Sequence, residues 1–249
     1  MKVLITAKNG QLGYQLQQTL PEGIEAKFCD RTELDISNQQ QVEAVITKFK
    51  PNIIINAAAY TAVDKAESEP EIADLHNHLA VQYLAEVASK INAKVIHVST
   101  DYVFAGNKNQ ALDPKEPVDP INVYGQSKLK GEQVLQKLLP DNHIIVRTSW
   151  VYGEHGNNFV KTMIRLMNDR TELNIINDQY GAPTYAKSLA ELLWVIAKDK
   201  THNGIYHFSD QANISWHEFA EEIYKQGKKL NLIKQDVKIG GIDSQSYPT

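Results

Sequence analysis

A regular alternation of short apolar runs and helical segments in the first part of the chain most constrains what it can fold into. Short, largely apolar runs lie at Val3–Thr6, Ala26–Cys29, Ile53–Ile55, Val95–Val98 and Ile144–Val146. Runs that are apolar on both faces are typical of strands in a parallel sheet that helices cover on both sides. Because crossovers between parallel strands are right-handed, the sequence predicts an α/β fold with a doubly wound parallel sheet of the Rossmann type.

The segments between these runs have the apolar spacing of helices. The expected helices run from Leu12 to Leu20, Gln41 to Lys50, Pro70 to Ile91 and Val123 to Leu138. After about Tyr152 the alternation loosens, and we interpret short strands at Leu173–Ile176 and Ile205–Phe208 as parts of a smaller lobe. We therefore expect one domain over residues 1–152, to which later segments return, and a partly interleaved lobe over most of residues 153–249.

Composition and charge exclude several classes of protein. The chain has 249 residues, a formal net charge of -4 and a pI near 6.1, which argues against a general nucleic-acid binder. The single cysteine, Cys29, excludes a disulfide framework and suits a reducing compartment. A strand that begins at Lys2 leaves no room for a signal peptide, and no apolar run is long enough to span a bilayer. We expect a cytoplasmic protein without a membrane or nucleic-acid partner.

The turn after the first strand has the features of a phosphate-binding turn. In the segment Thr6–Gly13, Gly10 allows the backbone to approach a pyrophosphate, and Gly13 allows the following helix to pack on the strand. Glycines alone also occur in plain turns from a strand to a helix. Asp30 at the end of the second strand favours a dinucleotide, because it can hydrogen-bond a ribose, whereas Arg31 can instead face a 2′-phosphate. We therefore expect the first domain to bind a dinucleotide.

Tyr124-Gly-Gln-Ser-Lys128 places a phenol and an ammonium group four residues apart, where a helix is expected to begin. At that spacing the two side chains share one helix face. A free tyrosine titrates near ~10, and a neighbouring cation favours the phenolate, so we expect Lys128 to pull the pKa of Tyr124 toward the working range. The pair would then exchange protons with an alcohol oxygen. Alone, this motif is a weak signal, because it occurs by chance on many surface helices.

Two further segments follow strands at the same edge of the predicted sheet. Asn56–Tyr60 follows the third strand with three alanines that leave space, and Ser99–Phe104 leaves the fourth strand. Ligands bind at the carboxyl ends of parallel strands, so we expect the hydroxyl groups of Ser99 and Thr100 to face a cleft beside Tyr124. The plainer interpretations stay open, namely small residues that pack a helix and hydroxyl groups that bond turn amides.

The eight histidines are scattered along the sequence. His76 and His78 stand two residues apart, which does not place them on one helix face, and no cysteine or carboxylate cluster accompanies them. The sequence therefore predicts no metal site.

Six segments carry a resemblance to a known family. They are Asn9–Gly13, Asn56–Glu67, Ser99–Phe104, Tyr124–Lys128, Arg147–Gly153 and Asp178–Thr184. In this order and combination they resemble the extended short-chain dehydrogenase/reductases, and within that group the family of dTDP-4-dehydrorhamnose reductases. The segments span nearly the whole chain, so their combination is far more specific than any one of them.

The resemblance implies reduction of the 4-keto group of dTDP-6-deoxy-L-lyxo-4-hexulose to dTDP-L-rhamnose, with a nucleotide sugar as substrate. It implies NADPH as cofactor, with NADH as an alternative, and leaves a homodimer open. Tyr124 would donate the proton, Thr100 would hydrogen-bond the reacting oxygen, and Lys128 would hold the nicotinamide ribose.

The resemblance also implies which residues bind the two ligands. The substrate is expected to contact Thr100, Asp101, Tyr124 and Trp150, although Trp150 has a plainer interpretation as a core residue. The cofactor is expected to contact Gly10, Gln11, Leu12, Asp30, Arg31, Asp35, Ile36, Ala57, Ala58, Ala59, Tyr60, Tyr124 and Lys128.

The chain departs from the family pattern at three places. Glycine usually stands where this chain has Ala7, and one methyl group there would crowd the turn mildly. The family normally continues beyond Tyr247–Thr249 with an arginine-proline motif and a helix, so we expect the second lobe to be truncated at its C-terminal end. The family's magnesium, at a subunit contact involving glutamates, is not expected, because the early helix has Gln15 and Gln17 instead.

Three alternatives stay open. A 4,6-dehydratase of the same superfamily needs a Thr-Asp-Glu run, whereas this chain has Tyr102 in the third position. A 4-epimerase uses the same tyrosine and lysine and is harder to exclude. A non-catalytic relative, such as the regulatory subunit of methionine adenosyltransferase, binds a dinucleotide but serves a partner protein. Net consumption of a reduced nicotinamide would separate the reductase from the last two.

Overall fold

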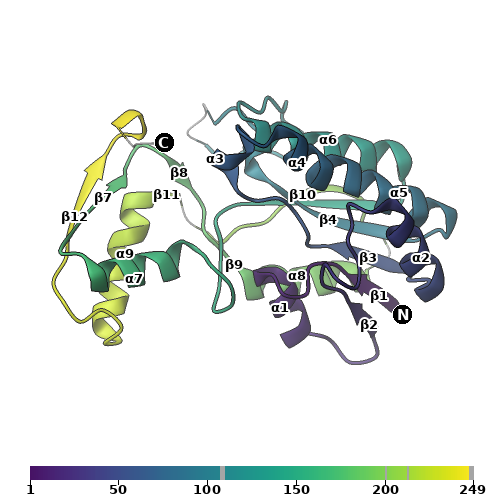
Figure 1. Ribbon diagram of the computed structural model, residues 1–249, viewed down its shortest axis with the longest axis horizontal. Helices are drawn as coiled ribbons and strands as arrows, with labels where there is room; N and C mark the ends of the chain where they lie inside the picture. The colour runs from purple at the N-terminus through teal and green to yellow at the C-terminus, as the bar shows by residue number, and fades with distance from the viewer. Residues whose placement is uncertain (107–109, 200, 212, 247–249) are drawn as a thin grey trace. The chain divides into compact units, whose positions relative to one another are not determined.

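The computed structural model describes residues 1–106, 110–199, 201–211 and 213–246, which form two compact units (Figure 1). Unit 1 consists of Met1–Thr148 and Lys187–Phe208, and unit 2 consists of Ser149–Ala186 and Ser209–Thr249. The segment Tyr247–Thr249, where the chain was expected to depart from the family, lies outside the described residues.

A six-stranded sheet forms the centre of unit 1. Its strands lie in the order β2-β1-β3-β4-β5-β10, and all neighbours pair in parallel. The chain runs from β1 outward to β2 and then returns past β1 to β3, so the winding direction reverses between β1 and β3. The predicted doubly wound α/β fold is confirmed. The strands are β1 (Lys2–Ile5), β2 (Glu25–Phe28), β3 (Ile53–Asn56), β4 (Lys94–Thr100), β5 (His143–Thr148) and β10 (Gly204–His207).

The position of β10 differs from the sequence prediction. The strand expected at Ile205–Phe208 was assigned to the smaller lobe, and this assignment is wrong. Gly204–His207 instead pairs in register with Ile144–Arg147 at the edge of the central sheet. The physical reason is that β5 would otherwise present an unpaired edge, and β10 satisfies its backbone groups.

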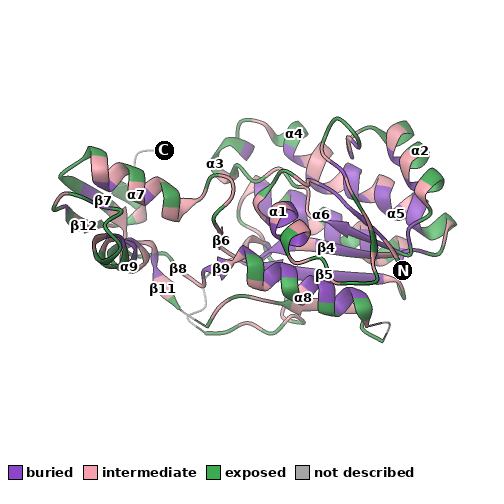
Figure 2. Cartoon of the chain, turned by 90° about the horizontal axis from the view of Figure 1, so that it is seen from below, coloured by how far each residue is buried: buried purple, intermediate pink, exposed green. Residues whose placement is uncertain are grey.

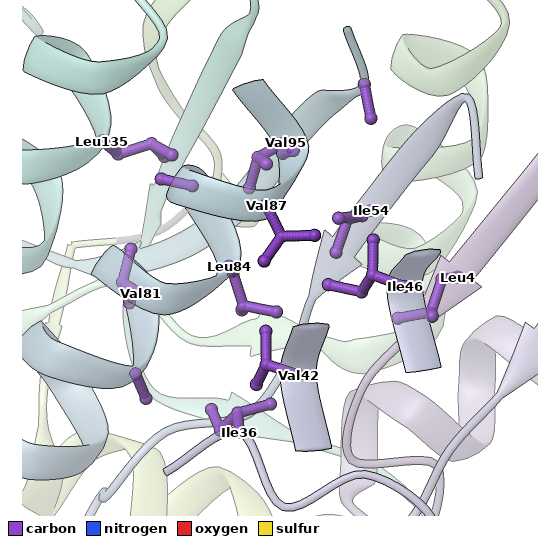
Figure 3. Packing of buried hydrophobic residues seen from close by; sticks show 14 of the residues in the cluster. Leu4, Ile36, Val42, Ile46, Ile54, Val81, Leu84, Val87, Val95 and Leu135 are labelled. Carbon is purple, nitrogen blue, oxygen red and sulfur yellow. The ribbon is translucent and has the colours of Figure 1, made fainter. Parts of the chain in front are cut away.

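Helices cover both faces of this sheet (Figure 1). On one face, side chains of the strands pack against α2 and α5 in a buried cluster that includes Leu4, Ile54, Ile46, Leu84 and Val87 (Figure 3). On the other face, the Trp194 side chain of α8 donates a hydrogen bond to the Leu16 carbonyl of α1 at 3.1 Å. The helices of these layers are α1 (Gln11–Gln18), α2 (Gln39–Phe49), α5 (Ala80–Lys90), α6 (Val123–Leu138) and α8 (Ala186–Lys198).

The helix predicted from Pro70 to Ile91 is not continuous. It consists of α4 (Pro70–Asp74), a π-helical turn at Leu75–Leu79, and α5. The π turn buries Asn77 completely, and this polar side chain bonds to the loop after β3. Inserted π turns of this kind are frequent at functional sites. Short helical turns also lie at α3 (Val63–Ala66) and η2 (Asp101–Val103).

Unit 2 has a core of its own. Met163 and Met167 of α7 pack with Ile223 of α9 and Leu173 of β7 (Figure 2 shows the burial along both units). Ser215 begins α9 with a capping box that Glu218 completes. The elements are β6 (Val151–Tyr152), α7 (Phe159–Asp169), β7 (Glu172–Ile176), β8 (Tyr180–Gly181), β9 (Thr184–Tyr185), β11 (Ile214–Ser215), α9 (Trp216–Lys229), β12 (Lys238–Ile242) and η3 (Ser244–Ser246).

Across the described residues, the helices are too short or too polar for any of them to cross a membrane.

Candidate active site

The turn between β1 and α1 is shaped by the close approach of Ala7 and Gly13. A Cβ atom on Gly13 would lie 2.1 Å from the Ala7 carbonyl oxygen, so this position requires glycine. Gly10 is the N-cap of α1, and Gln11 and Leu12 form its first turn, which is fully described and contains no acidic residue. The positive end of the helix dipole is therefore not neutralised by its own side chains, which fits a turn that receives a pyrophosphate.

A cavity of about 290 Å³ opens beside this turn at the point where the winding of the sheet reverses. Ligands of doubly wound folds bind at this point. Sequence reasoning missed two lining residues, Leu34 and His76, because neither belongs to a motif. The predicted cofactor residues that line the cavity are Arg31, Asp35, Ile36, Ala58, Ala59 and Tyr60, and Ala7 joins them.

The Asp30 carboxylate is bonded by neighbouring side chains, whereas the Arg31 side chain is largely exposed. Asp30 accepts hydrogen bonds from the Thr32 hydroxyl at 2.7 Å and lies 3.2 Å from the Lys8 ammonium. The Thr32 hydrogen bond and then that of Lys8 lower the pKa of Asp30 to about 2. Arg31 is three-quarters exposed, and its Nε atom lies 3.5 Å from Asp35. Arg31 is thus an exposed cation among the residues that line the cavity.

Lys128 lies at the end of a buried polar chain that begins at Thr6, directly after β1. Its Nζ atom donates to the Val98 carbonyl at 2.7 Å and lies 3.2 Å from Nε2 of His97. Nδ1 of His97 lies 3.1 Å from Nδ2 of Asn56, and Oδ1 of Asn56 accepts from the Thr6 hydroxyl at 2.8 Å. Burial lowers the pKa of Lys128 to about 8. Sequence reasoning missed His97, although a histidine within an apolar strand was a usable signal.

The expected effect of Lys128 on Tyr124 is corrected by the structure. Both residues lie on α6 and are buried. Burial raises the pKa of the Tyr124 phenol, and a hydrogen bond with Thr100 only partly offsets this. The spacing of the two residues indicated a shared face correctly, but it did not show that the phenol loses its water or that the lysine bonds to β4.

Thr100 and Asp101 lie where β4 ends, close to Tyr124. The Thr100 hydroxyl donates to the Asp101 carboxylate at 3.1 Å and accepts from the Tyr102 amide at 3.2 Å. Burial raises the pKa of Asp101 to about 6, against the effect of the Thr100 hydrogen bond. The buried Ser99 hydroxyl has no hydrogen-bond partner among the described residues. The structure therefore brings Thr100, Asp101 and Tyr124 together, as expected from sequence.

Asn77 is a further residue that sequence reasoning missed. Its side chain bonds both backbone groups of Tyr60, at 2.9 and 3.0 Å, and donates to the Ser127 hydroxyl at 3.0 Å. Ser127 in turn donates to the Tyr124 carbonyl at 2.7 Å. The π turn thereby ties the loop that lines the cavity to the first turn of α6.

Trp150 lies in unit 2, within a group of aromatic residues. Its ring stacks on Trp216 with centroids 3.5 Å apart, and a Cβ atom on Gly181 would lie 2.8 Å from the indole. Trp150 has a φ of 47°, an uncommon conformation for a bulky residue. Such strain is typical of functional positions, although the stacking also shows that Trp150 contributes to the packing of its unit.

Comparison with known proteins places this site in a family. Residues 1–249 match the family described as RmlD substrate binding domain. The chain belongs to the RmlD substrate binding domain family. A curated member, dTDP-4-dehydrorhamnose reductase of Aggregatibacter actinomycetemcomitans, is 43% identical over 255 residues, which cover 100% of this chain and 86% of the relative.

Solved structures of this RmlD family agree with the fold. The dTDP-4-dehydrorhamnose reductase of Bacillus anthracis, solved in complex with NADP, is 40% identical and has a TM-score of 0.92, covering 98% of this chain and 84% of that one. The ortholog from Clostridium acetobutylicum is 38% identical with a TM-score of 0.92, covering 100% and 86%. The resemblance noted in the sequence is confirmed.

Proposed function

We propose that this protein is a dTDP-4-dehydrorhamnose reductase, which uses NADPH to reduce the 4-keto group of dTDP-6-deoxy-L-lyxo-4-hexulose to dTDP-L-rhamnose. The observation that carries the proposal is the buried group of Thr100, Tyr124 and Lys128 at the carboxyl end of β4, in a chain that matches a reductase of this name over its whole length. The cavity and the glycine turn after β1 fit a dinucleotide, and the Bacillus anthracis relative was solved with NADP.

When bound, a reduced nicotinamide would supply the hydride that carbon 4 of the sugar accepts. Tyr124 donates its phenolic proton to oxygen 4 as charge develops there. The Thr100 hydroxyl, whose single proton bonds the Asp101 carboxylate in the free protein, turns to donate to the same oxygen. Because its pKa is raised, Tyr124 is protonated at neutral pH and can act as the acid. Solvent then returns a proton to the phenolate, so one hydride and one proton are consumed for each alcohol formed.

The other residues bind and orient. Lys128 would hold the ribose next to the nicotinamide, and Arg31 would bind a 2′-phosphate. Asp101, which is already bonded to Thr100, positions the sugar. Trp150 covers the apolar side of the deoxysugar. A cytoplasmic location and a homodimer are further proposals, which rest on the sequence and its resemblance.

The decisive experiment mixes the protein with NADPH and the 4-keto sugar and follows both reactants to completion. We expect one NADPH to be oxidised for each dTDP-L-rhamnose formed. A 4-epimerase would convert its substrate without net NADPH consumption, and a regulatory protein would bind the dinucleotide without turnover. Either of those outcomes would contradict the proposed function.

A further inference from the structure

The direction of the buried hydrogen bonds between β1 and α6 is fixed by backbone amides. The Thr6 hydroxyl oxygen accepts from the amides of Ala57 and Ala58, at 3.0 and 3.1 Å. Since these amides only donate, both acceptor positions of the hydroxyl are occupied and its own proton must be donated elsewhere. It points to Oδ1 of Asn56, at 2.8 Å.

The orientation of the Asn56 amide follows from this. Its Oδ1 atom accepts from Thr6 and also lies 3.2 Å from the amide nitrogen of Ala58, so the oxygen cannot be exchanged with the nitrogen without placing donors against donors. The Nδ2 group therefore donates to Nδ1 of His97, at 3.1 Å. A neutral imidazole whose Nδ1 accepts carries its proton on Nε2.

His97 is neutral because it is completely buried, and burial together with Lys128 holds its pKa well below the usual range. Its Nε2–H group faces Nζ of Lys128 at 3.2 Å. An ammonium group has donors only, whereas a neutral amine has a lone pair that can accept this hydrogen bond. The amine still donates to the Val98 carbonyl.

We propose that His97 is a positioning residue that favours the neutral amine form of Lys128 in the free protein, through a polarised chain that begins at the hydroxyl of Thr6. This effect on Lys128 belongs to the free protein, and only its consequence for catalysis rests on the proposed function. In that reaction, the anionic cofactor would shift Lys128 back toward its charged form.

The groups around Lys128 decide how strongly its neutral form is opposed. Glu132, one turn further along α6, raises the pKa of Lys128, but its carboxylate forms a buried ion pair with Arg147 at 2.6 Å. The Tyr124 phenol on the same helix is neutral because its pKa is raised. Burial of Lys128 acts in the same direction as the hydrogen-bond chain.

The chain can be reversed at Asn56, without touching Lys128. Asn56→Asp keeps an oxygen for the Thr6 hydroxyl and the Ala58 amide, and replaces the Nδ2 donor with a second oxygen that faces His97 as an acceptor. His97 would then carry its proton on Nδ1 and accept from a charged Lys128. Thr6→Ser keeps the hydroxyl that starts the chain and serves as the control.

The test is NMR of the cofactor-free protein, with ring ¹⁵N signals to identify the tautomer of His97. A ¹³Cε-lysine titration, assigned with Lys128→Met, gives the pKa of Lys128. Above pH 8, in the wild type and Thr6→Ser, we expect the Nε2–H tautomer, with a Lys128 pKa at or below about 8. In Asn56→Asp we expect the Nδ1–H tautomer and a rise of the Lys128 pKa by at least about one pH unit.

An Nδ1–H tautomer in the wild type, which needs no variant, would overturn the proposal. So would an Asn56→Asp protein in which His97 keeps the Nε2–H tautomer and Lys128 titrates as in the wild type. These results are independent of NADPH turnover, so they separate the proposed chain from the proposed function.

Discussion

The Cβ atom that an alanine would place at position 13 would lie 2.1 Å from the carbonyl oxygen of Ala7, so helix α1 rests directly on the turn that precedes it. Ala7 itself has a φ of 54°, in the left-handed region. The turn is therefore tight at Gly13 and strained at Ala7. The methyl group of Ala7, where the family usually has glycine, therefore makes the backbone conformation of the turn unfavourable as well as crowding it.

Ala7→Gly should stabilise the protein. A left-handed conformation costs roughly 1–2 kcal/mol for a residue with a Cβ atom, and the extra freedom of glycine in the unfolded chain offsets about 0.4–1 kcal/mol. We expect a net gain of up to about 1 kcal/mol in the free energy of unfolding, measured by denaturant titration. Ala44→Gly, on the exposed face of α2, is the control and should lose about 1 kcal/mol. Equal losses in both variants would show that Ala7 is unstrained.

Lys128→Met should remove a pH dependence of stability. The folded pKa of Lys128, about 8, lies below its ordinary value of 10.5, so the unfolded chain binds more protons between these two pH values. The free energy of unfolding therefore rises with pH across this window, by up to about 3 kcal/mol, and the gain is lost as pH falls through about 8.

The measurement is unfolding at about pH 7 and about pH 10, where the difference between variants isolates this group. Lys130→Met, which removes an exposed lysine of α6, should keep the wild-type slope. If Lys128→Met keeps that slope as well, the lysine has an ordinary pKa in the folded protein.

Arg31→Ala should weaken NADPH binding by roughly tenfold and leave NADH binding nearly unchanged, because only NADPH has a 2′-phosphate. Arg165→Ala is the matched control, since Arg165 is also exposed and lies within 3.7 Å of an aspartate four residues away. Fluorescence titration with both cofactors measures the effect. Equal losses for NADPH and NADH would remove Arg31 from the phosphate site.

Trp150→Ala should impair sugar turnover and leave NADPH affinity intact. It also loses the stack on Trp216, so we expect a lower melting temperature; because Trp150 is only half-buried, the loss should be smaller than the roughly 3–5 kcal/mol that truncation of a fully buried tryptophan costs. Trp216→Ala removes the same stack and controls for that loss. If both variants lose stability and turnover to the same extent, Trp150 is a packing residue and its contact with the sugar should be abandoned.

Much of this architecture could be predicted because apolar runs and their spacing report burial directly. The five strands from Val3 to Val146 follow from such runs. The position of β10 does not, because the run at Ile205–Phe208 predicts a strand but not its partner, which is determined by the free edge of β5. The π turn at Asn77 is hidden inside an otherwise regular helical pattern.

The site residues that belong to motifs after strands could be predicted from the sequence. The pKa shifts and contacts that depend on burial could not. Thr100, Asp101 and Tyr124 come together because parallel strands end at one edge. The raised pKa of Tyr124 and the contact of Lys128 with His97 depend on which side chains lose water. Spacing along one helix contains no information about that loss.

Tyr124→Phe tests the central claim most directly, because it removes only the phenolic hydroxyl that should donate the proton. The measurement is the rate of NADPH oxidation with the 4-keto sugar, alongside NADPH affinity, with Tyr83→Phe on α5 as the control phenol. We predict a fall of roughly two to four orders of magnitude for Tyr124→Phe, with unchanged NADPH affinity and a normal rate for the control. Normal turnover by Tyr124→Phe would contradict the account, since another group would then have to protonate the sugar.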